Sequence, residues 1–233
     1  MIDQSRETRR TMSVGVIGSE QEPLLQIDGM LADPERLLQS ADRIAFAPAF
    51  SAAGGYPGLR AAAPRAYVEH MVQTLTGPIA RAFGLGKIRP TKADCAFSIV
   101  TLSPDRLAPT QRAPHVDTTN GWQFAILHYL CDSSFGGTAF YHHRATGFET
   151  ITPDRQPAFL AARQQETPSD GYAEDGEPWF KRTATVDADF NRAVVYRSHL
   201  LHSGQIKNPA GLSPDPRRGR LTANIFVSYE PSD

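Results

Sequence analysis

The chain has 233 residues, of which 40% are hydrophobic and 21% charged, and its formal net charge is −1. This length suits one large domain, or one domain with a helical extension, and a chain of this size can bury a core without disulfides. The balanced charge excludes the basic surplus that favours nucleic acid or an anionic membrane surface, and no apolar segment approaches the roughly 20 residues of a membrane span.

The two cysteines indicate a reducing compartment. Cys95 and Cys131 lie in apolar, strand-like segments and outside any CxxC motif. We interpret both as reduced structural residues, because a buried free cysteine behaves as a small hydrophobe. The first ten residues are polar and lack the apolar stretch of a signal peptide. These features favour a cytoplasmic protein.

The N-terminal part of the chain predicts helices. In chain order we expect a loose polar segment, a short strand, a helix, a loop rich in Gly and Pro, and a second helix, over residues 1–14, 23–31, 33–45, 46–59 and 64–85. Asp33 can cap the first helix and Pro34 suits its first turn. Pro78 is expected to kink or split the second helix.

Strand signals dominate from about residue 93 onward. Short runs rich in β-branched and aromatic residues, bounded by turn residues, cover 95–102, 122–130, 136–143, 192–197 and 220–229. Many short strands with turn signals indicate a sandwich or barrel. The chain therefore predicts one α+β domain over 1–233, with a strand and helices at 23–85 packed on a β-core at 93–233.

Residues 152–181 interrupt these strands. The segment is polar and proline-rich, with room for one short helix. A long insertion between strands is commonly a functional lid or a mobile loop. We expect it to form part of the rim of a site, anchored by Trp179 and Phe180.

The segment APHVDTTNGW places His115 and Asp117 two positions apart, just after a proline. An extended segment puts residues i and i+2 on the same side. The pair could be a surface ion pair, a buried hydrogen bond or two ligands of a metal, and the spacing alone leaves these alternatives open. Further imidazoles occur in VVYRSHLLHSG, where His199 lies in a turn and His202 precedes the next extended stretch.

Taken in order, these motifs resemble the Fe(II)/2-oxoglutarate-dependent oxygenases. The signature of that superfamily is H-x-D, then a distal His, then an Arg or Lys on the following strand. Its counterparts here are His115 and Asp117 in PHVD, followed by His202 in LLHSG and Arg220 in GRLTANIF. LLQIDGMLADPERLLQSA and YLCDSSFGGTAFY resemble segments of prolyl-hydroxylase-like members, so the resemblance runs from about residue 24 to the end.

The resemblance implies a double-stranded β-helix, or jelly roll, with N-terminal helices packed on it. It also implies a dioxygenase that uses Fe(II), 2-oxoglutarate and dioxygen to oxidise, most simply to hydroxylate, a small-molecule or amino-acid/peptidyl substrate. The iron ligands would be His115, Asp117 and His202, because two imidazoles and one carboxylate form the facial triad of such enzymes. His199 is the alternative third ligand.

Arg220 and Thr222 would hold 2-oxoglutarate. On the last strand Arg220, Thr222 and Asn224 alternate with apolar residues, so one face offers a guanidinium, a hydroxyl and an amide. Arginine suits the distal carboxylate of 2-oxoglutarate because its planar fork binds carboxylates in bidentate fashion. Further candidates are the hydroxyls of Tyr129 and Tyr141 and, within the loop at 207–219, Arg217 and Arg218, which are weaker candidates than Arg220.

Two other functions fit the same residues. A cupin-like metal enzyme that does not use 2-oxoglutarate would make Arg220 a structural residue. A non-catalytic jelly-roll binding protein would keep the fold without the chemistry. Asp117 argues against a halogenase, because halogenases of this superfamily lack the carboxylate. The substrate does not follow from fold and triad, since one fold hosts many functions.

Overall fold

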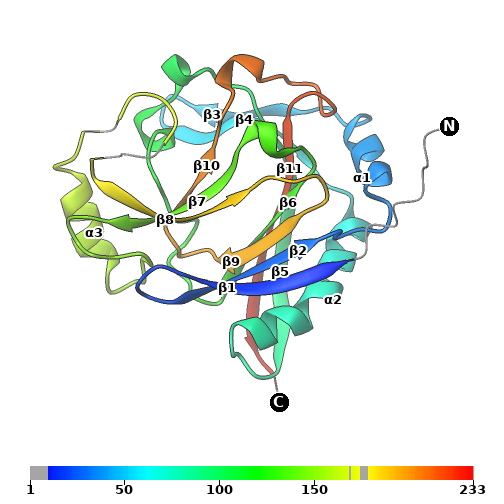
Figure 1. Ribbon diagram of the computed structural model, residues 1–233, viewed down its shortest axis with the longest axis horizontal. Coiled ribbons are helices and arrows are strands. Elements are labelled where there is room, and N and C mark those ends of the chain that lie inside the picture. The colour runs from blue at the N-terminus through cyan, green and yellow to red at the C-terminus, as the bar shows by residue number, and fades with distance from the viewer. Residues whose placement is uncertain (1–9, 168, 174–177, 233) are drawn as a thin grey trace.

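The computed structural model describes residues 10–167, 169–173 and 178–232, which form two antiparallel β-sheets and three α-helices (Figure 1). The α+β class predicted from the sequence is confirmed. The large sheet has eight strands in the order β1-β2-β9-β6-β11-β5-β4-β3, and the small sheet has the order β10-β7-β8. None of the helices within these residues is long and apolar enough to cross a membrane.

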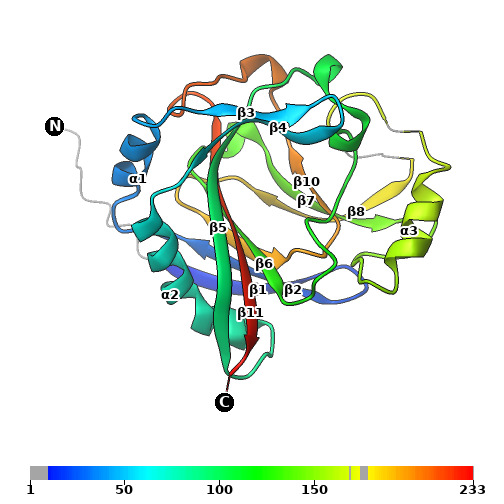
Figure 2. The same cartoon turned by 180° about the vertical axis from the view of Figure 1, so that it is seen from behind.

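The elements have the following bounds. The strands are β1 (Thr11–Ile17), β2 (Glu22–Asp28), β3 (Ala47–Ser51), β4 (Gly54–Ala62), β5 (Ile88–Val100), β6 (Gln123–Tyr129), β7 (Gly137–His143), β8 (Phe180–Asp187), β9 (Ala193–Arg197), β10 (His202–Gln205) and β11 (Arg220–Pro231). The α-helices are α1 (Pro34–Ala41), α2 (Arg65–Ala82) and α3 (Gln156–Arg163). Figure 2 shows α1 and α2 on one side of the molecule and α3 on the other.

The main core lies between α2 and one face of the large sheet. Strand β11 runs between β6 and β5, so it is paired along both edges. Its residues Leu221, Ala223 and Ile225 are completely buried and belong to the same apolar cluster as Leu75 and Ile79 of α2. Because side chains alternate along a strand, the residues between them face the other side, where the candidate site lies.

Both predicted N-terminal helices are present. At α1 the Asp33 side chain accepts a hydrogen bond from the Arg36 backbone N–H at 3.3 Å, and Pro34 occupies the first turn, as the sequence predicts. Of the kink or split predicted at Pro78, the split is wrong, because α2 runs from Arg65 to Ala82 with this proline inside it. Packing of its apolar face against the sheet outweighs the missing hydrogen bond.

The structure corrects two predicted loops. Residues 11–14, expected to be loose, belong to β1, which pairs with β2, while residues 1–9 lie outside the described residues. The expected loop at 46–59 is the β3–β4 hairpin. Its Gly and Pro content has structural causes: Gly54 has a φ of 121°, and a Cβ on Gly58 would lie 2.0 Å from the Ile99 carbonyl oxygen. Glycine thus allows β4 to approach β5.

The described part of the 152–181 segment contains the expected short helix, α3. Its last two residues begin strand β8, so the insertion ends earlier than predicted. Phe180 is 2% exposed and packs in an apolar cluster with Phe159 of α3, and the Trp179 indole Nε1–H donates to the Thr167 carbonyl at 2.8 Å. Tyr172 is buried, and its hydroxyl donates to the Leu102 carbonyl at 2.7 Å.

Candidate metal and anion site

Backbone hydrogen bonds bring the H-x-D segment to the start of β10. The N–H groups of His115 and His202 each donate to the other residue's carbonyl at 2.9 Å. The Asp117 N–H donates to the Ser198 carbonyl, also at 2.9 Å. Segments almost ninety residues apart in the sequence are therefore held side by side, which aligns both imidazoles with the carboxylate.

These three side chains form a cluster with the geometry of a metal site. The Nε2 atoms of His115 and His202 lie 4.0 and 3.6 Å from the two carboxylate oxygens of Asp117. One potential ligand atom from each residue lies within 4.8 Å of the others. The other ring nitrogen of His202, Nδ1, lies 2.8 Å from the Leu200 carbonyl oxygen and must donate to it, so the Nε2 lone pair stays free.

The pKa values in the cluster suit a cation. Desolvation lowers the pKa of His115 and of His202 to about 4, so both imidazoles are neutral near pH 7. Burial raises the pKa of Asp117 to about 6, because its negative charge is poorly solvated. A bound cation would relieve that cost and would accept the lone pairs of the neutral rings.

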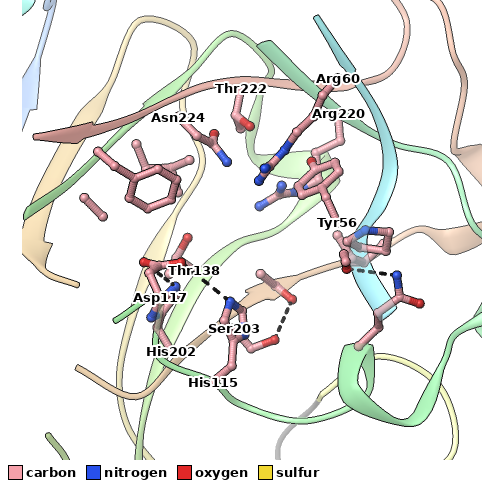
Figure 3. A pocket seen from close by; sticks show the side chains of 18 of the residues that line it. Tyr56, Arg60, His115, Asp117, Thr138, His202, Ser203, Arg220, Thr222 and Asn224 are labelled. Atoms are coloured by element: carbon pink, nitrogen blue, oxygen red, sulfur yellow. Dashed lines mark hydrogen bonds and ion pairs between the residues drawn. The ribbon is translucent and has the colours of Figure 1, made fainter. Parts of the chain in front are cut away.

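The predicted anion-binding residues lie in the same pocket. Arg220 is 4% exposed, and one of its terminal nitrogens donates to the Gly137 carbonyl at 2.7 Å, while its Nε–H has no partner. Thr222 and Asn224 line the pocket beside it, and the Asn224 Oδ1 is also unpartnered. The predicted alternation thus places all three side chains on one face of β11 (Figure 3).

The pocket has a volume of about 340 Å³ and lies between the two sheets. Its lining includes Thr138 and His202 from the small sheet, and Arg220 and Thr222 from the large one. Tyr172 also lines it, so the described part of the 152–181 segment reaches the pocket wall. In Figure 3 the arginine side chains enter from the side opposite the His–Asp–His cluster.

Several candidates lie elsewhere. The His199 ring is outside the cluster, with Nε2 4.0 Å from a Glu22 carboxylate oxygen. The Tyr129 hydroxyl bonds to Thr138 at 2.7 Å, and the Tyr141 hydroxyl accepts from Gln205 at 2.9 Å. Neither tyrosine lines the pocket, and the loop arginines Arg217 and Arg218 do not line it either.

Sequence reasoning missed several residues of the pocket wall, among them Tyr56 and Arg60 of β4. Both lie in or next to the segment expected to be a loop. The available signal was their spacing of four residues with Gly58 midway, which in a strand places all three on one face.

Comparisons place the fold among known structures. The chain is similar to SnoN, a non-heme alpha ketoglutarate dependent epimerase from nogalamycin biosynthesis, with a TM-score of 0.54, 17% identity and coverage of 90% of this chain and 79% of that chain. It is also similar to HygX from Streptomyces hygroscopicus, solved with nickel and 2-oxoglutarate bound, with a TM-score of 0.53, 14% identity and coverage of 91% and 84%. Identities this low establish the shared fold alone.

Sequence comparison identifies the family. A search of curated proteins gave no match. The model described as "Family of unknown function (DUF6445)" matches residues 8–227, which is nearly the whole chain. The chain therefore belongs to the DUF6445 family.

Proposed function

We propose that this protein is a non-haem Fe(II)- and 2-oxoglutarate-dependent dioxygenase that oxidises, most simply hydroxylates, a small-molecule or amino-acid/peptidyl substrate. One observation carries the proposal. Two neutral imidazoles and a carboxylate converge in the same pocket as a buried arginine whose Nε–H has no partner.

The donor set fits iron. Two imidazole nitrogens and one carboxylate oxygen are the ligands of the facial triad, which suits Fe(II) and leaves positions open for other ligands. Among the described residues, His115, Asp117 and His202 make up the one group of three or more His, Cys, Asp or Glu side chains with such spacing. The hydrogen bond from His202 to Leu200 would fix the ring orientation of that ligand.

The opposite end of the pocket fits the distal carboxylate of 2-oxoglutarate. A buried carboxylate without a partner is very costly, whereas Arg220 presents a free N–H in a fixed, buried position. Thr222 is completely buried next to it and would add a hydroxyl. In this proposal Arg220 and Thr222 anchor the distal carboxylate of the cosubstrate. The triad of His115, Asp117 and His202 holds the metal at the other end of the pocket.

Iron with 2-oxoglutarate, when bound, would activate dioxygen, which is the oxidant of the substrate. The chain's own residues would orient both and limit the access of water. The folds of SnoN and HygX support this proposal, since their structures are described with 2-oxoglutarate or a dependence on it. Two sheets with a pocket between them also support a jelly-roll, prolyl-hydroxylase-like architecture.

Binding and turnover of the cosubstrate test the proposal. Calorimetry should show one Fe(II) per chain under anaerobic conditions, and then saturable binding of 2-oxoglutarate to the iron-loaded protein. In air, the loaded protein should convert 2-oxoglutarate slowly to succinate without added substrate. Iron binding without 2-oxoglutarate binding would favour the cupin-like enzyme instead, and binding of neither would favour the non-catalytic binding protein.

A further inference from the structure

A second guanidinium enters the pocket beside Arg220. It belongs to Arg60, which lies on β4 and lines the pocket together with Tyr56 (Figure 3). The two side chains contact each other, since the guanidinium carbon of Arg60 lies over the Tyr56 ring, 4.7 Å from its centroid.

The hairpin that carries these residues is held firmly. Thr110 and Gln111, from the short helix after Ala108, donate hydrogen bonds to the carbonyls of Ala53 and Gly55 at 3.2 and 2.9 Å. Residues 58–62 of β4, which include Arg60, pair with β5 in continuous register. Arg60 is thus presented by a paired strand, and Tyr56 follows the hydrogen-bonded Gly55, which reduces the ordering cost of binding a ligand.

The polar atoms of this pair have no partners. The Arg60 Nε and the Tyr56 hydroxyl are both buried and form no hydrogen bond. No carboxylate of the described residues lies within ion-pair distance of Arg60. Buried donors of this kind are costly to leave unpaired, so their presence in a pocket wall indicates an anionic ligand.

With Fe(II) and 2-oxoglutarate bound as proposed, the charges in the pocket do not sum to zero, and one guanidinium charge remains uncompensated. Asp117 is the one carboxylate among the described residues that line the pocket, and it offsets one of the two arginines. The two positive charges of Fe(II) and the two negative charges of 2-oxoglutarate cancel each other. One positive charge remains, which matches a single carboxylate better than a phosphate monoester, whose charge is about −1.5 to −2 near pH 7.

The two guanidinium groups enter the pocket from the same side, opposite the His–Asp–His cluster (Figure 3). They are carried by different strands, since Arg60 and Tyr56 belong to β4, whereas Arg220 and Thr222 belong to β11.

We propose that Arg60 and Tyr56 form a second anion subsite that binds a carboxylate of the primary substrate. This inference rests on the proposed function and narrows its substrate class to small organic acids, including free amino acids, in place of an internal peptidyl side chain. The pocket volume of about 340 Å³ agrees with a small acid, because it lies at the low end of the range for ligand sites, about 300–1,000 Å³, and 2-oxoglutarate takes part of it.

Acetate is the probe for this subsite, because it has the carboxylate group that all carboxylic acid substrates share. The protein is loaded with diamagnetic Zn(II) and saturating 2-oxoglutarate, and acetate is titrated while the Arg Nε–H resonances are followed by NMR. We expect a saturable shift of the Arg60 resonance with acetate and none with acetamide at equal concentration. Arg60→Gln should weaken acetate binding about ten- to a hundredfold, and Tyr56→Phe about two- to tenfold.

The variants separate the subsite from the rest of the pocket. Arg60→Gln should bind 2-oxoglutarate within about threefold of the wild type, as expected for removal of a group that does not contact it. Arg89→Gln is the matched control, because its guanidinium is exposed and pairs with Glu230 outside the pocket. It should change neither affinity. Tyr56→Phe removes only the hydroxyl and keeps the ring under Arg60. This variant therefore still tests the subsite if Arg60→Gln does not fold.

Two results would overturn the inference while leaving the oxygenase proposal intact. Unchanged acetate binding in Arg60→Gln would show that acetate binds elsewhere, for example at the metal. A loss of 2-oxoglutarate binding in Arg60→Gln as large as that in Arg220→Gln would assign Arg60 to the cosubstrate. If the wild-type protein binds no 2-oxoglutarate, the proposed function itself fails, and the inference with it.

Discussion

The two faces of the large sheet differ in how completely their polar atoms are paired. The face toward α2 is apolar, and its one buried imidazole, His128, has a partner at each nitrogen: the Tyr67 hydroxyl at 3.0 Å and Asn191 at 3.1 Å. The face toward the pocket carries Arg220 and Asn224, each with a buried polar atom that has no partner. One sheet thus has a face whose buried imidazole is fully paired and an opposite face that keeps unpaired polar atoms for the proposed ligands.

We propose that this difference separates structural polar residues from ligand-binding ones. A satisfied group such as His128 contributes its hydrogen bonds to the folded state. An unsatisfied group such as the Arg220 Nε–H costs stability until a ligand supplies the missing partner, a cost that proteins commonly carry at functional sites. Substitutions on the pocket face should therefore change binding more than stability, and substitutions on the helix face should do the reverse.

The largest expected effect is on metal binding. Asp117→Ala and His202→Ala each remove one of the three proposed ligands, and either change should abolish tight Fe(II) binding. Calorimetry with anaerobic Fe(II) measures this. His199→Ala is the control, because its ring lies against Glu22 and outside the cluster. Loss of iron binding in His199→Ala with retention in His202→Ala would disprove the assignment of the third ligand.

Arg220→Ala should weaken the binding of 2-oxoglutarate and leave the binding of Fe(II) unchanged. Removing one partner of a buried ion pair costs about 3–5 kcal/mol. That corresponds to roughly two to four decades in affinity for 2-oxoglutarate, since each 1.4 kcal/mol is about tenfold. Iron should still bind, because no ligand is removed. Arg220→Lys should lose less, since the charge survives.

The control for this change is Arg217→Ala. The Arg217 guanidinium pairs with Asp42 at 2.6 Å and lies outside the pocket lining. The Arg217→Ala variant should bind 2-oxoglutarate with nearly wild-type affinity, as measured by calorimetry. Equal losses in Arg217→Ala and Arg220→Ala would contradict the division between the pocket face and the rest of the surface.

Leu221→Ala probes the opposite face at the adjacent position of β11. Leu221 is completely buried in the cluster that includes Leu75 and Ile79 of α2. Truncation of a buried leucine to alanine costs about 2–5 kcal/mol of unfolding free energy. Urea unfolding should show this loss, while the folded variant keeps wild-type affinities for iron and 2-oxoglutarate. A selective loss of 2-oxoglutarate binding would contradict the independence of the two faces.

The sequence predicts the pocket face of β11 well because a strand has a period of two. Arg220, Thr222 and Asn224 had to share a side once the strand itself was recognised. It predicts β4 poorly. Gly54, Gly55 and Gly58 are typical of loops in local propensity, yet here they permit a tight hairpin and close contact with β5. Long-range pairing decides such a segment, and local composition does not report it.

The same limit applies to the site. H-x-D is a local pattern, so His115 and Asp117 can be singled out from their spacing. The pairing of this segment with His202 depends on backbone bonds between distant segments. Arg60 was missed entirely, because its significance comes from the side chains that surround it and from the absence of a partner among the described residues. Neither property is visible in a single sequence.

The smallest expected effect concerns His128 and the dependence of stability on pH. Burial lowers the pKa of His128 to about 4, although its hydrogen bond to Asn191 opposes this. An unfolded histidine titrates near pH 6.5, so the unfolded chain binds a proton here before the folded one does. The stability of the folded state should therefore fall as the pH drops from about 6.5 toward 4, with a slope of at most about 1.4 kcal/mol per pH unit from this residue.

His128→Gln removes the titration, so urea unfolding across this range should give a shallower slope than in the wild type, whatever the variant's absolute stability. The remaining slope reflects other groups, including His115 and His202, whose pKa values burial also lowers to about 4. Equal slopes in the two proteins would mean that His128 is not held neutral by the helix face, and the contrast between the two faces would then need a different explanation.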